Sequence, residues 1–270
     1  MSARIAPGPR SSQIRTSTPI LRGYYAVLIA LLYLPIAILV LFSFNANQVL
    51  TFPLQGFTLQ WYGNALATPT ALTAARNSVL VATGSSVVAT LLATMVAILV
   101  ARYRFRGKQL LVAISVLPLI VPYIVLAVAL LLLFAALGVN RSLWTVGIAH
   151  SVIALPYAFL IIVARLGGVS PFLEEAAADL GADYLTTLRR IILPIIAPAI
   201  MAAWLVAFTA SFDEFALALF LAGADPTLPV FIYGQLRFAS RLPMLISLAA
   251  MVMAGTLTLA FIADQLRRRP

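Results

Sequence analysis

The chain has 270 residues, of which 63% are apolar and only 10% are charged, and its mean hydropathy is +1.04. Because soluble domains are roughly 45–50% apolar and about 25% charged, this composition excludes a water-soluble enzyme and a disordered chain. The 18 basic and 8 acidic side chains give a net charge of +10. In so apolar a chain, this charge indicates a membrane protein with a basic cytoplasmic side and no nucleic-acid partner. The absence of cysteine excludes disulfides, thiolate metal sites and a cysteine nucleophile.

Six apolar segments are long enough for membrane-crossing helices, each of which needs roughly 20 apolar residues. They predict an all-α membrane protein built as a bundle of six transmembrane helices. The predicted spans are Tyr24–Phe44, Ser78–Val100, Leu110–Leu137, Leu143–Val163, Ile195–Leu221 and Met244–Ile262. The third is overlong and contains Pro118 and Pro122, so it is either one tilted, kinked span or a broken one.

The basic residues alternate between the two sides of the predicted bundle. Fourteen of them lie in the two termini and in the connections after the second and fourth spans, and four lie in the remaining connections. Because cytoplasmic segments carry the excess of Lys and Arg, both termini are predicted to be cytoplasmic.

The domain organisation follows from these spans. We expect a cytoplasmic tail at residues 1–23, a first helix at 24–44, an extracytoplasmic segment at 45–77, a core of five spans at 78–266 and a cytoplasmic tail at 267–270. The first helix is longer than the roughly 7–15 apolar residues of a cleavable signal, which favours a retained signal-anchor. The Ser-, Pro- and Arg-rich stretch at 1–18 is expected to be poorly ordered.

The cytoplasmic connection Gly168–Pro194 has a helix–glycine–helix pattern, which we call the elbow. The pair Ser170–Pro171 is typical of a helix start, and Gly181 is expected to supply the left-handed turn that ends this first helix. Asp183 can then cap a second helix, which Pro194 is expected to close as the fifth span begins.

Within the first elbow helix, apolar residues are predicted to share one face, flanked by the acidic residues Glu174, Glu175 and Asp179. The residues of this face are Leu173, Ala176, Ala177 and Leu180. Amphipathic elbows also occur at the membrane interface of polytopic proteins in general, so helix physics alone does not assign a role to this one.

The spacing of the elbow residues resembles the EAA motif of ABC importer permeases at every position. The matching residues are Glu175, Ala176, Ala177, Gly181, Ile191, Leu193 and Pro194. In that family the motif forms a coupling helix that docks on a cytoplasmic ATPase. The resemblance implies the fold of a type I importer permease, in which Glu175 meets basic or hydroxyl groups of the ATPase. Ala176 and Ala177 would allow close approach, and Gly181 would set the angle of the elbow.

The resemblance also implies partners for this chain. They are a second permease subunit, two ATPase subunits and an extracytoplasmic solute-binding protein. The sequence contains no phosphate-binding loop of the form G-x-x-x-x-G-K-[ST], so ATP and Mg²⁺ are expected on the partner ATPase. We therefore expect a transport subunit that is not an enzyme and that holds no cofactor or metal.

Further segments resemble the spermidine/putrescine permeases, in particular the second permease subunit of those systems. They are Arg102–Lys108, Gly56–Thr58, Trp61–Tyr62 and Ser211–Glu214. The resemblance implies import of a polyamine or a related cationic solute across the inner membrane of a bacterium. Importers of opines and other small organic solutes share the subfamily and are the alternative. An ion-gradient-driven secondary transporter is a further alternative, although we find no convincing internal repeat.

Two carboxylates, those of Asp213 and Glu214, lie inside the fifth predicted span. Because a charged side chain in the bilayer costs about 2.5–3.5 kcal/mol on insertion scales, such residues usually face a cavity or a partner. They predict a cation-attracting wall of the translocation path, with Phe212 and Trp204 adding cation–π contacts. Alternatively, one or both pair with a base on the second permease subunit or lie near the outer interface. Neighbouring helical residues differ by about 100°, so at most one points squarely into a pore.

The single histidine, His150, lies in the fourth predicted span beside Ser151. No acidic partner for it lies in the third or fourth span, which favours a histidine satisfied within the bundle over a catalytic base. Ser85 and Ser86 in the second span are expected to let helices pack closely.

Overall fold

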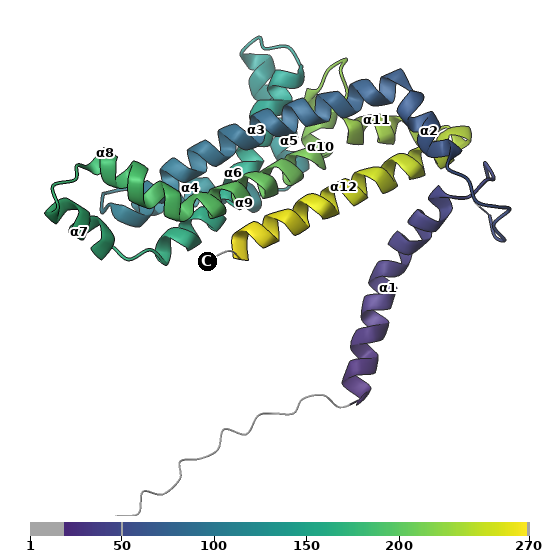
Figure 1. Cartoon of the computed structure of the whole chain (residues 1–270). Helices are drawn as coiled ribbons and strands as arrows, with labels where there is room; N and C mark the ends of the chain where they lie inside the picture. The colour runs from purple at the N-terminus through teal and green to yellow at the C-terminus, as the bar shows by residue number, and fades with distance from the viewer. Residues whose placement is uncertain (1–18, 50, 269–270) are drawn as a thin grey trace, which may run out of the picture.

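The computed structural model describes residues 19–49 and 51–268, and these residues are mostly helical (Figure 1). The predictions for residues 1–18 and for the last two residues lie outside the described chain. The first half contains α1 (Pro19–Ser43), α2 (Gln60–Ala67), α3 (Pro69–Arg102), α4 (Lys108–Val116), the 3₁₀ turn η1 (Leu117–Leu119) and α5 (Tyr123–Ala136). The second half contains α6 (Leu143–Gly167), α7 (Phe172–Asp179), α8 (Tyr184–Thr187), the π turn η2 (Leu188–Ile192), α9 (Leu193–Phe212), α10 (Ala216–Leu221), α11 (Leu228–Gln235), the 3₁₀ turn η3 (Ala239–Arg241) and α12 (Leu242–Arg268).

Five of the described helical segments are long and apolar enough to cross a membrane without interruption. They are Leu21–Ser43, Pro69–Arg102, Leu143–Gly167, Tyr184–Phe212 and Ala239–Ile262. Each corresponds to one of the six predicted apolar segments. The second is longer than predicted because Pro69 starts its helix within the segment assigned to the extracytoplasmic side, and proline is favoured in the first helical turn.

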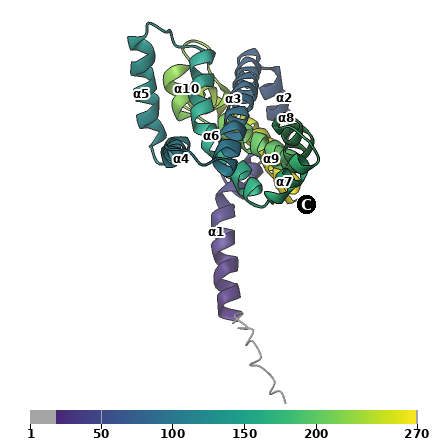
Figure 2. The same cartoon turned by 90° about the vertical axis from the view of Figure 1, so that its left-hand side faces the viewer.

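The third predicted span is broken. Lys108–Leu119 and Tyr123–Ala136 meet at an angle of 106°, which makes them either one broken span or a re-entrant loop. The break coincides with Pro118 and Pro122, which lack the N–H group that a continuous helix requires. Figure 2 shows α5 standing beside the bundle, with α4 at its lower end.

The centre of the bundle is formed by α3, α6 and α9, which pack along one another. Their contact surfaces carry many fully buried alanines, which allow the backbones to approach closely. These alanines are Ala82, Ala89, Ala93, Ala97, Ala149, Ala154, Ala158, Ala203 and Ala207. Ser85 and Ser86 are buried in the same surface of α3, as the sequence predicts.

Two helices border this centre. The helix α12 runs along α9, and α1 contacts the bundle mainly through α12 before it projects away (Figures 1 and 2). Trp61 ties the connection after α1 to α2, because its buried indole N–H donates to the Asn45 carbonyl at 2.8 Å. Most of α1 is exposed in the single chain.

Candidate functional site

The elbow lies at one end of the bundle, where α7 and α8 form its two helices (Figure 1). Its first helix begins later than predicted: no side chain caps α7, so the prediction that Ser170 supplies a capping oxygen is wrong. The Glu174 amide instead donates to the Pro171 carbonyl at 3.0 Å. The acidic first turn of α7 still favours the helix, because negative charge stabilises its N-terminal dipole.

The joint of the elbow follows the sequence prediction. Gly181 has φ +82°, in the left-handed region that disfavours residues with a Cβ atom. The Ala182 amide donates to the Ala177 carbonyl at 2.9 Å, which closes the end of α7 as a Schellman-type turn. Asp183 then caps α8 by accepting from the Thr186 amide at 3.1 Å. The hydrogen bonds from Thr186 hold the pKa of the Asp183 carboxyl below its ordinary value.

The second limb of the elbow differs from the prediction. Pro194 does not close a separate helix, because α8, η2 and α9 form one continuous helical segment from Tyr184 to Phe212. In the π turn the Leu193 amide donates to the Leu188 carbonyl, and Pro194 follows in the first turn of α9. The motif residues Ile191 and Leu193 pack against the buried cluster of α3, α6 and α9. The joint at Gly181 therefore connects α7 directly to a membrane-crossing helix.

The motif residues of α7 point in different directions. Ala177 is buried, whereas Glu175 and Ala176 are exposed. Of the predicted apolar face, only Ala177 is buried, and Leu180 is 89% exposed in the single chain. The outward stripe has i, i+3, i+4, i+7, i+8 spacing and consists of Phe172, Glu175, Ala176, Asp179 and Leu180. We call it the α7 stripe.

A contact that the sequence analysis did not foresee ties α7 to the bundle. Arg102, the last residue of α3, places its Nε atom 2.5 Å from Oε1 of Glu174 and donates from Nη2 to the Val169 carbonyl at 3.2 Å. In the sequence analysis, Arg102 counted as a topology signal and as part of a segment with a family resemblance, and Glu174 as one of several acidic residues. The opposite charge of two residues at the membrane boundary is the signal that could have paired them.

A second group of predicted residues lies at the other end of α9. The fifth span is not a single helix there, because α9 ends at Phe212 and α10 begins at Ala216. Asp213 and Glu214 therefore lie in a break, and their side chains are separated: Asp213 is exposed and Glu214 is buried.

Asp213 lines a groove of about 500 Å³ between the break, α11 and α12. Phe215 and Tyr233 line the same groove, with their ring centroids 4.9 Å apart. A carboxylate beside two aromatic rings offers both a countercharge and π faces, which is the chemistry that recognises an organic ammonium group. Neither ring was predicted, because Phe215 was one of many aromatic residues and Tyr233 lay in a connection.

Glu214 does not line this groove. Its carboxylate lies 3.1 Å from Nε2 of His150 and accepts from the Leu217 and Ala218 amides. The prediction that Glu214 is a wall of a path is therefore not supported by its position, which is inside the bundle. The prediction that His150 is satisfied within the bundle holds for Nδ1, which lies 2.8 Å from the Ser211 Oγ, whereas Nε2 contacts Glu214 without hydrogen-bond geometry. Both partners come from the fifth apolar segment.

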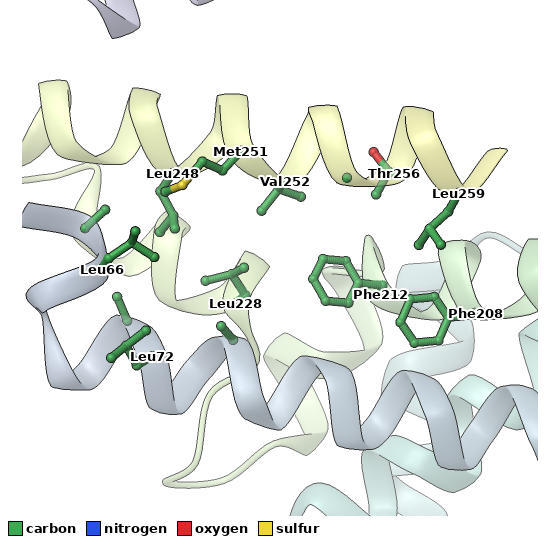
Figure 3. A pocket seen from close by; sticks show the side chains of 14 residues that line it. Leu66, Leu72, Phe208, Phe212, Leu228, Leu248, Met251, Val252, Thr256 and Leu259 are labelled. Atoms are coloured by element: carbon green, nitrogen blue, oxygen red, sulfur yellow. The ribbon is translucent and has the colours of Figure 1, made fainter. Parts of the chain in front are cut away.

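Phe212 and Trp204 belong to an aromatic row along α9 that the sequence revealed only in part. Phe208 lies between them, with ring centroids 6.0 Å from Trp204 and 5.8 Å from Phe212. Phe208 and Phe212 line a second, apolar cavity of about 350 Å³ against α3 and α12, as Figure 3 shows. Trp204 lies two helical turns from Phe212 and lines neither cavity. The i, i+4, i+8 spacing is the signal that could have identified Phe208.

In the part of the chain that the structure describes, no group of three or more His, Asp or Glu side chains could hold a metal ion.

Comparison with known proteins places these features in a family. Residues 89–270 match the model of the binding-protein-dependent transport system inner membrane component. The spermidine/putrescine transport system permease protein PotC of Escherichia coli K12 is 36% identical over 248 residues, which cover 92% of this chain and 93% of PotC. The putrescine transport system permease protein PotI of the same strain is 33% identical over 264 residues, which cover 93% of each chain.

Solved structures show the same fold. A bacterial alginate ABC transporter in complex with its alginate pentasaccharide-bound periplasmic protein contains a chain that matches with TM-score 0.71 at 15% identity, covering 93% of both chains. The inward-facing MetNI methionine ABC transporter matches with TM-score 0.63 at 16% identity, covering 73% of this chain and 94% of that one. The described helices therefore have the fold of a type I ABC importer permease. This chain belongs to the family of binding-protein-dependent transport system inner membrane components.

Proposed function

We propose that this permease is one of two membrane subunits of an ATP-driven importer of polyamines such as putrescine and spermidine. Its partners would be a second permease subunit, two ATPase subunits that bind ATP and Mg²⁺, and an extracytoplasmic solute-binding protein. Both chain termini and the elbow would lie on the cytoplasmic side of a bacterial inner membrane. The observation that carries the choice of solute is the Asp213 carboxylate beside two aromatic rings, in a chain related to named polyamine permeases.

The chemistry of the groove suits a flexible polycation. A polyamine carries ammonium groups separated by methylene segments, and it needs negative charge and aromatic or apolar surface in alternation. Asp213 supplies the charge, Phe215 and Tyr233 supply π faces, and Met253 and Val252 of α12 supply apolar wall. The groove is open in the single chain, so the second permease subunit would close it and keep the Asp213 carboxylate away from lipid.

The α7 stripe suits the coupling role. Phe172 and Leu180 lie at its two ends and are 74% and 89% exposed, which is unusual for large apolar side chains unless another surface covers them. Glu175 and Ala176 lie between them, so the stripe offers an apolar contact at each end and a carboxylate in its middle. A groove on a cytoplasmic ATPase subunit would bury this stripe, and α7 would pass its movement to the fifth span through Gly181.

The test uses the complete importer, made by expressing this chain with its neighbouring permease, ATPase and binding-protein genes. Reconstituted in liposomes, it is expected to accumulate radiolabelled putrescine or spermidine only when ATP is supplied on the ATPase side. A variant of the partner ATPase that binds but does not hydrolyse ATP should abolish accumulation. Uptake that is driven by an ion gradient without the ATPase, or a lack of competition by polyamines, would overturn the proposal.

Asp213→Asn tests the groove itself. The amide keeps the size of the side chain but removes its charge, so the KM for putrescine should rise on the order of tenfold, as expected for a lost charge-assisted contact. Asp225→Asn is the matched control, because Asp225 is an exposed carboxylate in the nearby connection and does not line the groove. An unchanged KM in Asp213→Asn would remove this residue from the path.

A further inference from the structure

A row of four buried polar side chains links three helices at the break between α9 and α10. Ser85 of α3 lies 2.8 Å from Ser211 of α9 between their Oγ atoms, and the Ser211 Oγ lies 2.8 Å from Nδ1 of His150 on α6. The other ring nitrogen of His150, Nε2, lies 3.1 Å from Oε2 of Glu214. All four side chains belong to residues at most 6% exposed, so their hydrogen bonds are shielded from water.

Donors and acceptors match along this row. The Glu214 carboxylate can only accept and lies 3.1 Å from Nε2, which favours a hydrogen on Nε2. In that neutral ring, Nδ1 accepts from the Ser211 hydroxyl. The Ser211 oxygen is then free to accept from Ser85. If the ring carries both hydrogens, Ser211 accepts from Nδ1 and donates to Ser85, which can donate to the Ala82 carbonyl at 3.3 Å. Both arrangements keep the hydrogen bonds among Ser85, Ser211 and His150. Between Nε2 and the Glu214 carboxylate there is a close contact at 3.1 Å without hydrogen-bond geometry.

The row ends on a carboxylate that shapes the backbone. Both Glu214 oxygens accept from the Leu217 amide, at 3.0 and 2.9 Å, and one accepts from the Ala218 amide at 3.2 Å. These amides belong to the first turn of α10, where no backbone acceptor is available within the helix. Glu214 thus caps α10, and His150 contacts the same oxygen, Oε2, that accepts from the Leu217 and Ala218 amides.

We propose that His150 and Ser211 are positioning residues for solute binding. By holding Glu214 inside the bundle as the cap of α10, they fix the break in the fifth span. The break turns the preceding residue, Asp213, toward the groove. This inference rests on the proposed function, since its main measurement is polyamine uptake. It assigns the two adjacent carboxylates opposite roles: the charge of Asp213 meets the solute, and Glu214 serves only as a hydrogen-bonding cap.

Glu214→Gln separates these roles. A glutamine keeps a carbonyl oxygen for the Leu217 and Ala218 amides, and its NH₂ can donate to Nε2 while Nδ1–H donates to Ser211. We expect the KM of Glu214→Gln to stay within about twofold of the wild-type value, whereas Glu214→Ala should raise it on the order of tenfold. If Glu214→Gln raises the KM as much as Asp213→Asn does, the Glu214 charge itself meets the solute and the proposal is wrong.

The serines provide a matched pair. Ser85→Ala removes a member of the row, whereas Ser86→Ala removes a neighbouring buried hydroxyl that bonds only to Thr83 of its own helix, at 3.1 Å. We expect Ser85→Ala and Ser211→Ala to raise the KM severalfold with Vmax per assembled complex unchanged, and Ser86→Ala to leave both unchanged. Equal effects of Ser85→Ala and Ser86→Ala would indicate packing alone and would overturn the proposal.

A second measurement does not depend on transport. The chain contains no cysteine, so Asp213→Cys introduces the one thiol of this subunit. In the assembled importer, its reaction rate with a membrane-impermeant thiol reagent should fall severalfold when His150→Phe or Glu214→Ala is added, and should be unchanged by Ser86→Ala. Unchanged labelling in all three would refute positioning. If the wild-type importer takes up no polyamine, the proposed function is wrong. The labelling rates still test whether the row orients the side chain at position 213.

Discussion

The Nε atom of Arg102 lies 2.5 Å from Oε1 of Glu174, which joins the last residue of α3 to the first turn of α7. The side chains are only 11% and 26% exposed, so water screens this ion pair less than a surface pair. The same guanidinium also donates to the Val169 carbonyl, in the connection that leads into α7. The Arg102 side chain therefore contacts both the first turn of α7 and the connection that leads into it.

This contact predicts that Arg102→Ala and Glu174→Ala uncouple the importer. Each leaves a half-buried charge without its partner, at a cost of about 1–3 kcal/mol, so α7 should move without carrying α3 along. We expect ATP hydrolysis to persist while uptake per ATP falls severalfold. The exchanged pair Arg102→Glu with Glu174→Arg should recover part of the uptake. Arg104→Ala, a change at an exposed neighbouring arginine, is the control. Equal losses in Arg104→Ala would count against a role specific to the pair.

A second prediction concerns the joint of the elbow. A Cβ atom at Gly181 would meet nothing within 4 Å, so only the left-handed backbone opposes a substitution there. Gly181→Ala should destabilise the joint by about 1–2 kcal/mol, and Gly181→Asn by less, since asparagine tolerates this conformation. Uptake should follow the order Gly, Asn, Ala, with the amount of assembled complex unchanged.

Gly168→Ala provides the control for the elbow. Gly168 has an ordinary negative φ of −88°, and a Cβ atom there would make an ordinary contact with the Arg165 carbonyl at 3.5 Å. Uptake by this variant should equal that of the wild type. If Gly181→Asn is no better than Gly181→Ala, backbone conformation is not what the motif glycine contributes.

The predictions made from sequence succeeded where the signal was local. Gly181 and Asp183 act on residues within one turn, so the glycine joint and the capping carboxylate were both visible in the chain. The prediction that Pro194 closes a helix was wrong, because proline is common both in the first turn of a helix and just after its end. The π turn before Pro194 keeps the helix continuous. The pattern of residues gives no sign of that turn.

The two adjacent carboxylates show what could not be predicted from the sequence. Asp213 and Glu214 have the same charge and neighbouring positions, and only the tertiary fold separates them. Glu214 contacts His150 inside the bundle. His150 lies on α6, far away in the sequence, and no spacing rule pairs the two residues. The break in the fifth span was likewise hidden, since the residues on both sides are mostly apolar. Pairing and breaks of this kind require the packed helices.

A third prediction uses the cap of α8. Because hydrogen bonds from Thr186 lower the pKa of Asp183, its ionised form is the one that stabilises the folded elbow. That stabilisation is fully present above the ordinary carboxyl pKa and is lost as pH falls through the lowered value. Asp183→Ala should therefore lower the melting temperature of the assembled importer at neutral pH, and this difference should vanish in acid. Asp183→Ser retains a capping oxygen, so its melting temperature at neutral pH should lie between those of Asp183→Ala and wild type. A pH-independent difference between Asp183→Ala and wild type would contradict this account.

The last prediction concerns the aromatic wall of the groove. The Tyr233 ring lies 4.9 Å from the Phe215 ring and is 58% exposed in the single chain, so its π face is available to an ammonium group. Tyr233→Leu keeps an apolar side chain but removes the ring. A cation–π contact contributes about 0.5–2 kcal/mol, so the KM for putrescine should rise about two- to thirtyfold. Tyr233→Phe keeps the ring and should preserve the KM, and Tyr24→Leu, on the outer surface of α1, should not change it. Because an uncharged solute gains nothing from a π face beyond its apolar area, equal KM values in Tyr233→Leu and Tyr233→Phe would show that this wall does not recognise a cation.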